Sequence, residues 1–120
     1  MGITIKITIA FISLLHIYFL WFEMFAWTSR GPKIFRKFPK ELFAQTKAMA
    51  ANQGLYNGFL AAGLLWTFFI DNPDWITYIS LFFLGCVAIA GIYGAFTVSK
   101  KIFYVQALPA IIVIILIVLS

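Results

Sequence analysis

The chain has 120 residues, of which 63% are hydrophobic, 19% are aromatic and 11% are charged, and its formal net charge is +5. Soluble domains carry roughly 25% charged residues, and a small one needs polar side chains to cover its large surface. The composition therefore excludes an ordinary water-soluble domain and indicates lipid as the solvent. The one cysteine, Cys86, lies in an apolar run, which excludes a disulfide framework.

Four apolar stretches follow one another along the chain, at about residues 7–27, 49–70, 76–98 and 102–119. A helix needs about 20 residues to cross a hydrocarbon core of about 30 Å. None of the stretches shows the alternation of a barrel strand, so only helices can satisfy their backbone polar groups in lipid. The sequence predicts an all-α fold, a four-helix transmembrane bundle, as a single domain over residues 1–120.

The loop at 28–48 sets the expected orientation of these spans. It holds six of the nine Lys and Arg residues against a single acid, Glu41, and the third loop, at 99–101, is also basic. The turn at 71–75 is acidic. Because basic short loops stay in the cytoplasm, we expect both termini to be extracytoplasmic in a bacterial plasma membrane, and only Lys6 opposes this orientation.

Apolar residues recur among the basic residues of the 28–48 loop, which predicts a short amphipathic segment in the headgroup plane, interrupted by Pro39. Each Lys or Arg near an anionic surface adds about 1 kcal/mol of attraction. We therefore expect membrane lipids, with anionic headgroups at this loop, as partners, although a topology signal alone explains the same charges. No nucleic acid is expected, because membrane and topology account for the basic residues. The apolar positions are Ile34, Phe35, Phe38, Leu42 and Phe43.

The first stretch contains two ionisable residues, His16 and Glu23. They are seven positions apart, so they lie about 20° apart around a helix and share a face. An ionised side chain in a span costs about 2.5 to 3.5 kcal/mol or more and usually faces the bundle interior with a partner. We expect both side chains to turn inward.

The second stretch opens with a polar segment at 52–58. Its side chains form i,i+4 pairs along one arc of a helix, and Gly54 and Gly58 allow another helix to approach closely. Because the first helix runs toward the cytoplasm and the second runs back, Glu23 and this segment are expected at similar depth. The candidate site, for ligand binding or proton carriage, consists of His16, Glu23, Asn52, Gln53, Tyr56 and Asn57.

The chemistry open to this site is narrow. Lipid disfavours a charged carboxylate, so Glu23 could carry a proton or act as a general acid, and His16 could shuttle protons. The amides and the tyrosine would orient a headgroup. One His and one Glu are too few for a metal site, and no cofactor or recognised reaction motif is expected. The alternative is that these groups only join helices, at about 0.6 kcal/mol for each hydrogen bond.

The last two stretches show packing features only. Small residues at Gly85, Ala88, Gly91 and Gly94 predict one packing face on the third helix, and Pro109 after Gln106 predicts a kink in the fourth.

Two segments carry a family resemblance: His-Ile-Tyr-Phe-Leu-Trp-Phe-Glu at 16–23 and Asn-Gln-Gly-Leu-Tyr-Asn-Gly at 52–58. The chain resembles a small four-span bacterial membrane family of unknown function, to which a staphylococcal membrane-stabilising protein is also similar. The resemblance implies four helices in a bacterial plasma membrane, with the six candidate residues as its signature. It implies no reaction.

Three functions fit these features. The first is a protein that binds a lipid or amphipathic ligand at the polar cluster and supports membrane integrity. The second is a small proton-coupled transporter, as a homo-oligomer, in which Glu23 exchanges protons for substrate. The third is an intramembrane enzyme for a lipid or isoprenoid, with Glu23 and His16 as acid and base. The sequence leaves open whether the protein is an enzyme.

Overall fold

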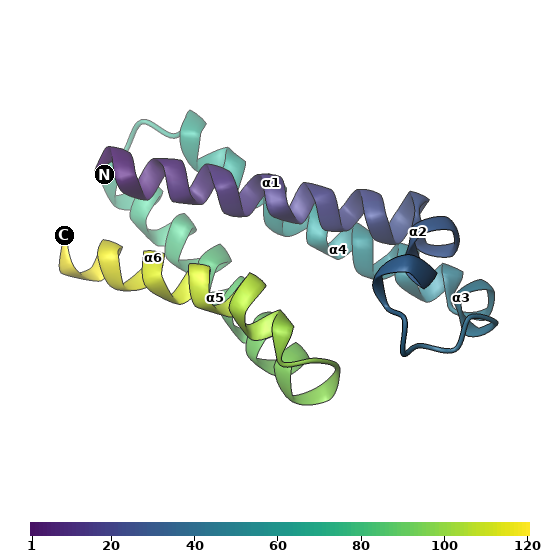
Figure 1. Ribbon diagram of the computed structural model, residues 1–120. Helices are drawn as coiled ribbons and strands as arrows, with labels where there is room; N and C mark the ends of the chain where they lie inside the picture. The colour runs from purple at the N-terminus through teal and green to yellow at the C-terminus, as the bar shows by residue number, and fades with distance from the viewer. The chain divides into compact units, whose positions relative to one another are not determined.

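The computed structural model describes all residues 1–120 and contains helices but no strand (Figure 1). The all-α fold is therefore confirmed. The elements, in chain order, are α1 (Ile3–Phe25), α2 (Trp27–Ile34), α3 (Leu42–Gln45), α4 (Lys47–Trp66), the 3-10 turn η1 (Thr67–Phe69), α5 (Pro73–Thr97), the π-helical turn η2 (Phe103–Ala107) and α6 (Leu108–Leu119).

The chain divides into two compact units. The first, here called the apolar unit, comprises Met1–Ser13 and Leu60–Ser120, and the second, the aromatic unit, comprises Leu14–Phe59. The start of α1 and the end of α4 belong to the apolar unit, together with η1, α5, η2 and α6. The aromatic unit holds the end of α1, the start of α4 and the whole of α2 and α3.

The core of the apolar unit is aliphatic. Helices α5 and α6 run side by side as an antiparallel hairpin (Figure 1). The start of α1 and the end of α4 add side chains to the same cluster. Its buried members are Ile5, Ile9, Ile12, Leu64, Leu84, Val87, Ala88, Ala110, Val113 and Ile117.

Two glycines of α5 allow this hairpin to pack closely. A Cβ atom at Gly91 would lie 2.5 Å from the backbone nitrogen of Ala107, and one at Gly94 would lie 2.9 Å from Cγ2 of Ile102. Gly85, by contrast, has no atom within 4 Å of its Cβ position. The expected packing face of small residues therefore includes Gly91 and Gly94 but not Gly85, which points into open space.

The helix that ends the chain changes its winding before Pro109. Its first part, η2, is a π-helical turn, and α6 begins at Leu108. Proline has no N–H to continue an α-helical ladder, and π-turns accommodate such interruptions and bend helices. This turn lies where the sequence predicts a kink.

Two of the four expected spans have both the length and the hydropathy to cross a membrane, and these are α1 and α5. Helix α4 has 20 residues, about 30 Å, but the polar segment at 52–58 lowers its hydropathy. The apolar helix Phe103–Leu119 is shorter than a typical span. The difference from the four predicted spans thus has two causes, polar content in α4 and length in the last helix.

The long helices carry their large apolar side chains on the outside. On α1 the exposed positions recur every three or four residues and form a continuous stripe along one face, and on α5 they share one face with a gap between Phe82 and Ile89. Three polar side chains, Ser13, His16 and Ser80, are in contrast fully buried. On α1 the stripe consists of Ile3, Ile7, Phe11, Leu14, Tyr18, Trp21 and Phe25, and on α5 it includes Trp75, Tyr78, Phe82, Ile89, Tyr93 and Phe96.

Candidate functional site

A hydrogen bond between α1 and α4 lies at the centre of the candidate site. The side-chain nitrogen Nδ2 of Asn57 donates to Oε1 of Glu23 at 2.5 Å. Glu23 is half-buried and Asn57 is only 9% exposed. The expected inward turn of Glu23, toward the polar start of the second long helix, therefore has a defined partner in the aromatic unit.

The close approach of the two helices depends on Gly54. A Cβ atom at Gly54 would lie 3.0 Å from the carbonyl oxygen of Leu20 and 3.0 Å from Cβ of Glu23. Gly58 lies against the Leu20 side chain in the same way. The two glycines thus bring the backbones close enough for Asn57 to reach the carboxylate, as small residues do in membrane helix pairs.

The other polar residues of this segment point away from the pair. Asn52, Gln53 and Tyr56 are exposed on α4, Tyr56 to 64%. The Tyr56 ring contacts Phe59 edge to face, with ring centroids 5.8 Å apart. The structure therefore separates the polar segment into one inward amide and an exposed polar patch of three side chains, here called the α4 patch.

His16 lies deeper in the unit than Glu23. Its side chain is fully buried, and its ring meets Phe19 edge to face at 5.2 Å. The seven positions between His16 and Glu23 correspond to about 10.5 Å along the helix axis. The two residues are thus two turns apart, with His16 fully buried and Glu23 half-buried. The roles of His16 and Glu23 as proton carriers or as an acid–base pair stay predictions.

The basic loop folds around one tryptophan, an arrangement that the sequence pattern does not predict. The Trp27 ring lies 5.1 Å from Phe43 and 5.8 Å from Phe22, measured between ring centroids. Its indole Nε1 donates a hydrogen bond of 3.0 Å to Oγ1 of Thr46, whose hydroxyl donates to the Leu42 carbonyl at 2.8 Å. The spacing of aromatic residues around Trp27 was the available signal, but a tryptophan at the end of a span equally fits a lipid anchor.

This aromatic core changes the interpretation of the amphipathic segment. Phe43 is 2% exposed and packs on Gly31, where any side chain would meet its ring. Ile34 and Phe35 are exposed, at 51% and 39%. The expected lipid-facing row is thus divided. Phe43 is buried in the aromatic core, Phe35 lies at its edge against Trp27, and Ile34 lies outside it, because the eight-residue helix α2 is followed by a turn that folds the chain back.

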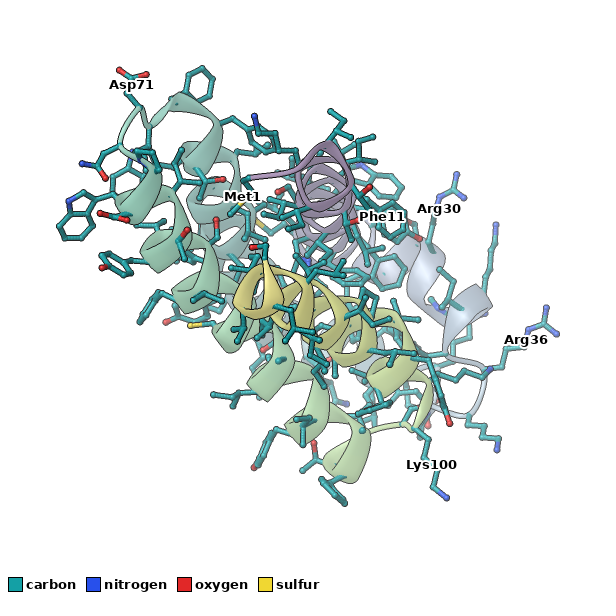
Figure 2. The ribbon with its side chains drawn as sticks, turned by 90° about the vertical axis from the view of Figure 1, so that its left-hand side faces the viewer. Met1, Phe11, Arg30, Arg36, Asp71 and Lys100 are labelled. Carbon is teal, nitrogen blue, oxygen red and sulfur yellow. The ribbon has the colours of Figure 1, made fainter.

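The cations of the loop lie outside this core. Figure 2 shows Arg30 and Arg36 extending away from the ribbon. The Arg30 guanidinium also lies over the Trp21 ring, 5.8 Å from its centroid. The exposed basic residues of the aromatic unit are Arg30, Lys33, Arg36, Lys37, Lys40 and Lys47.

The groups gathered here limit the chemistry that the site offers. No three side chains among His, Cys, Asp and Glu gather in a way that could hold a metal ion. The site offers a hydrogen-bonded carboxylate, exposed amides, a phenol and nearby cations. These groups suit a ligand that carries both polar and anionic atoms.

The fold and site define a small all-α protein with apolar helices and a polar helix pair. The chain belongs to the family described as "Protein of unknown function (DUF1304)", whose model matches residues 10–118. It is also similar to the uncharacterized protein YpaA of Lactococcus lactis subsp. lactis (strain IL1403), with 28% identity over 106 residues, or 87% of each chain. No solved structure matches it.

Proposed function

We propose that this protein is a multi-pass protein of the bacterial plasma membrane that binds a lipid or other amphipathic ligand at the α4 patch. Four crossings place the loop at 28–48 in the cytoplasm and both termini outside. The exposed apolar stripes of α1 and α5 are the argument for insertion into a membrane, since a soluble protein rarely exposes this much contiguous apolar surface. Helix α4 crosses despite its polar content because Gly54, Gly58 and Asn57 face α1.

The observation that carries the ligand proposal is the exposure of Asn52, Gln53 and Tyr56 on one turn after another of α4. In a span that begins near Lys47, these side chains lie about 7 to 14 Å along the axis from the helix start. At that depth, amides without a partner cost free energy. A lipid offers ester and hydroxyl groups there, and its anionic headgroup would meet the exposed cations of the aromatic unit.

The Glu23–Asn57 pair has a supporting role in this proposal. It joins α1 to α4 and so holds the α4 patch in a fixed orientation. His16 is fully enclosed by protein, and we assign it no contact with the ligand. Support of membrane integrity, as proposed from the resemblance to a membrane-stabilising protein, would follow from a lipid retained at this surface.

The test is lipid retention by purified protein, measured by native mass spectrometry. We expect the wild type to retain a phospholipid and the Asn52→Leu/Gln53→Leu variant to retain about tenfold less, the factor that 1.4 kcal/mol corresponds to. Tyr93→Phe, which removes an exposed polar group from α5 in the other unit, is the control and should retain lipid normally. Equal retention by the three proteins, or a dimer in which the α4 patch is cross-linked to a second copy, would refute the proposal.

A further inference from the structure

Two adjoining cavities lie in the apolar unit, at the end that holds Met1 and the turn before α5. Their volumes are about 90 Å³ and about 190 Å³, and Met1, Lys6 and Ile76 line both. The remaining walls are partly apolar and partly polar. The smaller cavity adds Ile9, Thr67, Phe68 and Ile70, and the larger adds Pro73, Thr77, Ile117 and Ser120.

Lys6 is an unusual residue for this position. It lies in the first turn of α1, where the positive end of the helix dipole disfavours a cation. In the proposed topology it also faces the extracytoplasmic side, so the positive-inside rule does not account for it. Lys6 forms no salt bridge, and the acidic residue Asp71 points outward, away from Met1 (Figure 2).

Two hydroxyl groups in or behind the larger cavity are unusual, whereas those of Thr67 and Ser120, also on the cavity walls, donate to backbone carbonyls. Thr8, Ser13 and Thr97 each donate to the carbonyl four residues earlier, at 2.8 Å. Thr77, which lines the larger cavity, forms no such bond, and the fully buried Ser80, one turn further along the same face of α5, has no hydrogen-bond partner. The ammonium group of Lys6 and the free hydroxyl of Thr77 thus lie on the wall of the larger cavity, and the unpartnered hydroxyl of Ser80 lies one turn from Thr77.

We infer that the larger cavity binds a phosphate-type oxyanion, held by the ammonium group of Lys6 and the hydroxyl group of Thr77. Lysine is a common phosphate ligand, and charge-assisted hydrogen bonds are the strongest that such groups form. The space exceeds the ~30 Å³ of one water but is below the ~300 Å³ of a pocket for a drug-sized molecule. It therefore suits a phosphate, either free or as the headgroup of a lipid whose tails lie along the apolar walls.

The test uses the acetylation of Lys6 in the wild-type protein, with Lys101 as the internal control. Both lysines are exposed, but Lys6 lines the cavities from α1, whereas Lys101 follows the last turn of α5 and lines neither cavity. The protein is placed in nanodiscs of phosphatidylglycerol, or in nanodiscs of a neutral glycosyl diacylglycerol with and without inorganic phosphate. An amine-reactive acetyl ester in solution reaches both faces of the nanodisc, so it can label both lysines. Mass spectrometry gives the acetylation rate of each lysine.

We expect the acetylation of Lys6 relative to Lys101 to slow about tenfold when the oxyanion is bound, the factor for 1.4 kcal/mol. Slowing with phosphatidylglycerol alone assigns the site to a lipid headgroup, and slowing with inorganic phosphate in neutral nanodiscs assigns it to free phosphate. A ratio that is the same under all three conditions overturns the inference. This result would leave the α4 patch untouched, because that patch lies in the other unit.

Two variants separate binding in the cavity from surface charge. Ile76→Trp fills the space that both cavities share and should remove the protection of Lys6. Thr77→Val keeps the size of the side chain and should weaken the protection about fivefold, as expected for one hydrogen bond. Protection that survives in both variants would show only attraction of Lys6 to a charged surface and would also overturn the inference.

Discussion

The two units of this protein build their interiors from different side chains. The apolar unit has an aliphatic cluster, and Gly91 and Gly94 allow its helix α5 to pack closely against Ile102 and Ala107. The aromatic unit has rings around Trp27 and hydrogen bonds between side chains. Lipid tails are as apolar as leucine, so helices in a membrane gain little from burial alone and rely on close packing. In the proposed topology the loop at 28–48 of the aromatic unit lies in water and can instead use the hydrophobic effect, so the comparison sets close packing between helices against burial in a loop core.

The largest effect is expected from Phe43→Ala in the aromatic unit. Phe43 is 2% exposed and contacts both Trp27 and Phe38, so its loss should lower the free energy of local unfolding by about 3–5 kcal/mol. Hydrogen exchange of the backbone amides in residues 27–46 measures this change in nanodiscs. Phe35→Ala removes a ring of the same cluster that is 39% exposed and should cost clearly less. Equal effects would show that burial on Trp27 does not stabilise the loop.

In the apolar unit, Gly91→Ala should reduce stability by about 1–3 kcal/mol because the new methyl group meets the backbone of Ala107. Steric trapping in bicelles gives the unfolding free energy. Gly85→Ala, on the same helix but in open space, is the control and should be neutral or gain up to about 1 kcal/mol from helix propensity. A harmless Gly91→Ala would mean that close packing does not hold α5 to the last helix.

A smaller gain is expected from Ser80→Ala. The Ser80 hydroxyl is fully buried without a partner, so its removal should raise the unfolding free energy by about 1 kcal/mol. Ser13→Ala removes an equally buried hydroxyl that donates to the Ile9 carbonyl, and it should bring no gain. The same unfolding measurement compares the two, and a destabilised Ser80→Ala protein would contradict the absence of a partner.

The smallest effect concerns the Glu23–Asn57 hydrogen bond. A double-mutant cycle with Glu23→Met and Asn57→Leu should give a coupling of about 0.6 kcal/mol, the average for side-chain hydrogen bonds in membranes. The same cycle with Glu23→Met and Gln53→Leu should give no coupling, since Gln53 is exposed. Coupling for Gln53 but not for Asn57 would contradict the geometry of the pair.

Local sequence patterns predicted the helical class and the meeting of Glu23 with the segment at 52–58. Helical periodicity and the cost of a lone carboxylate in lipid suffice for both. They could not select Asn57 from four polar neighbours, because that choice depends on how closely Gly54 lets α4 approach the Leu20 carbonyl. Nor could they show that Gly85 packs on nothing, since small residues at helical spacing look alike in sequence.

The sequence by itself therefore determined the helices, the basic loop and the few polar residues placed among apolar ones, because these depend on composition and period. Tertiary structure decided the partners: Asn57 for Glu23, Trp27 for Phe43 and Ala107 for Gly91. It also decided which hydroxyls find no partner. Contacts between residues far apart in the chain depend on helix separation and rotation, which no local pattern specifies.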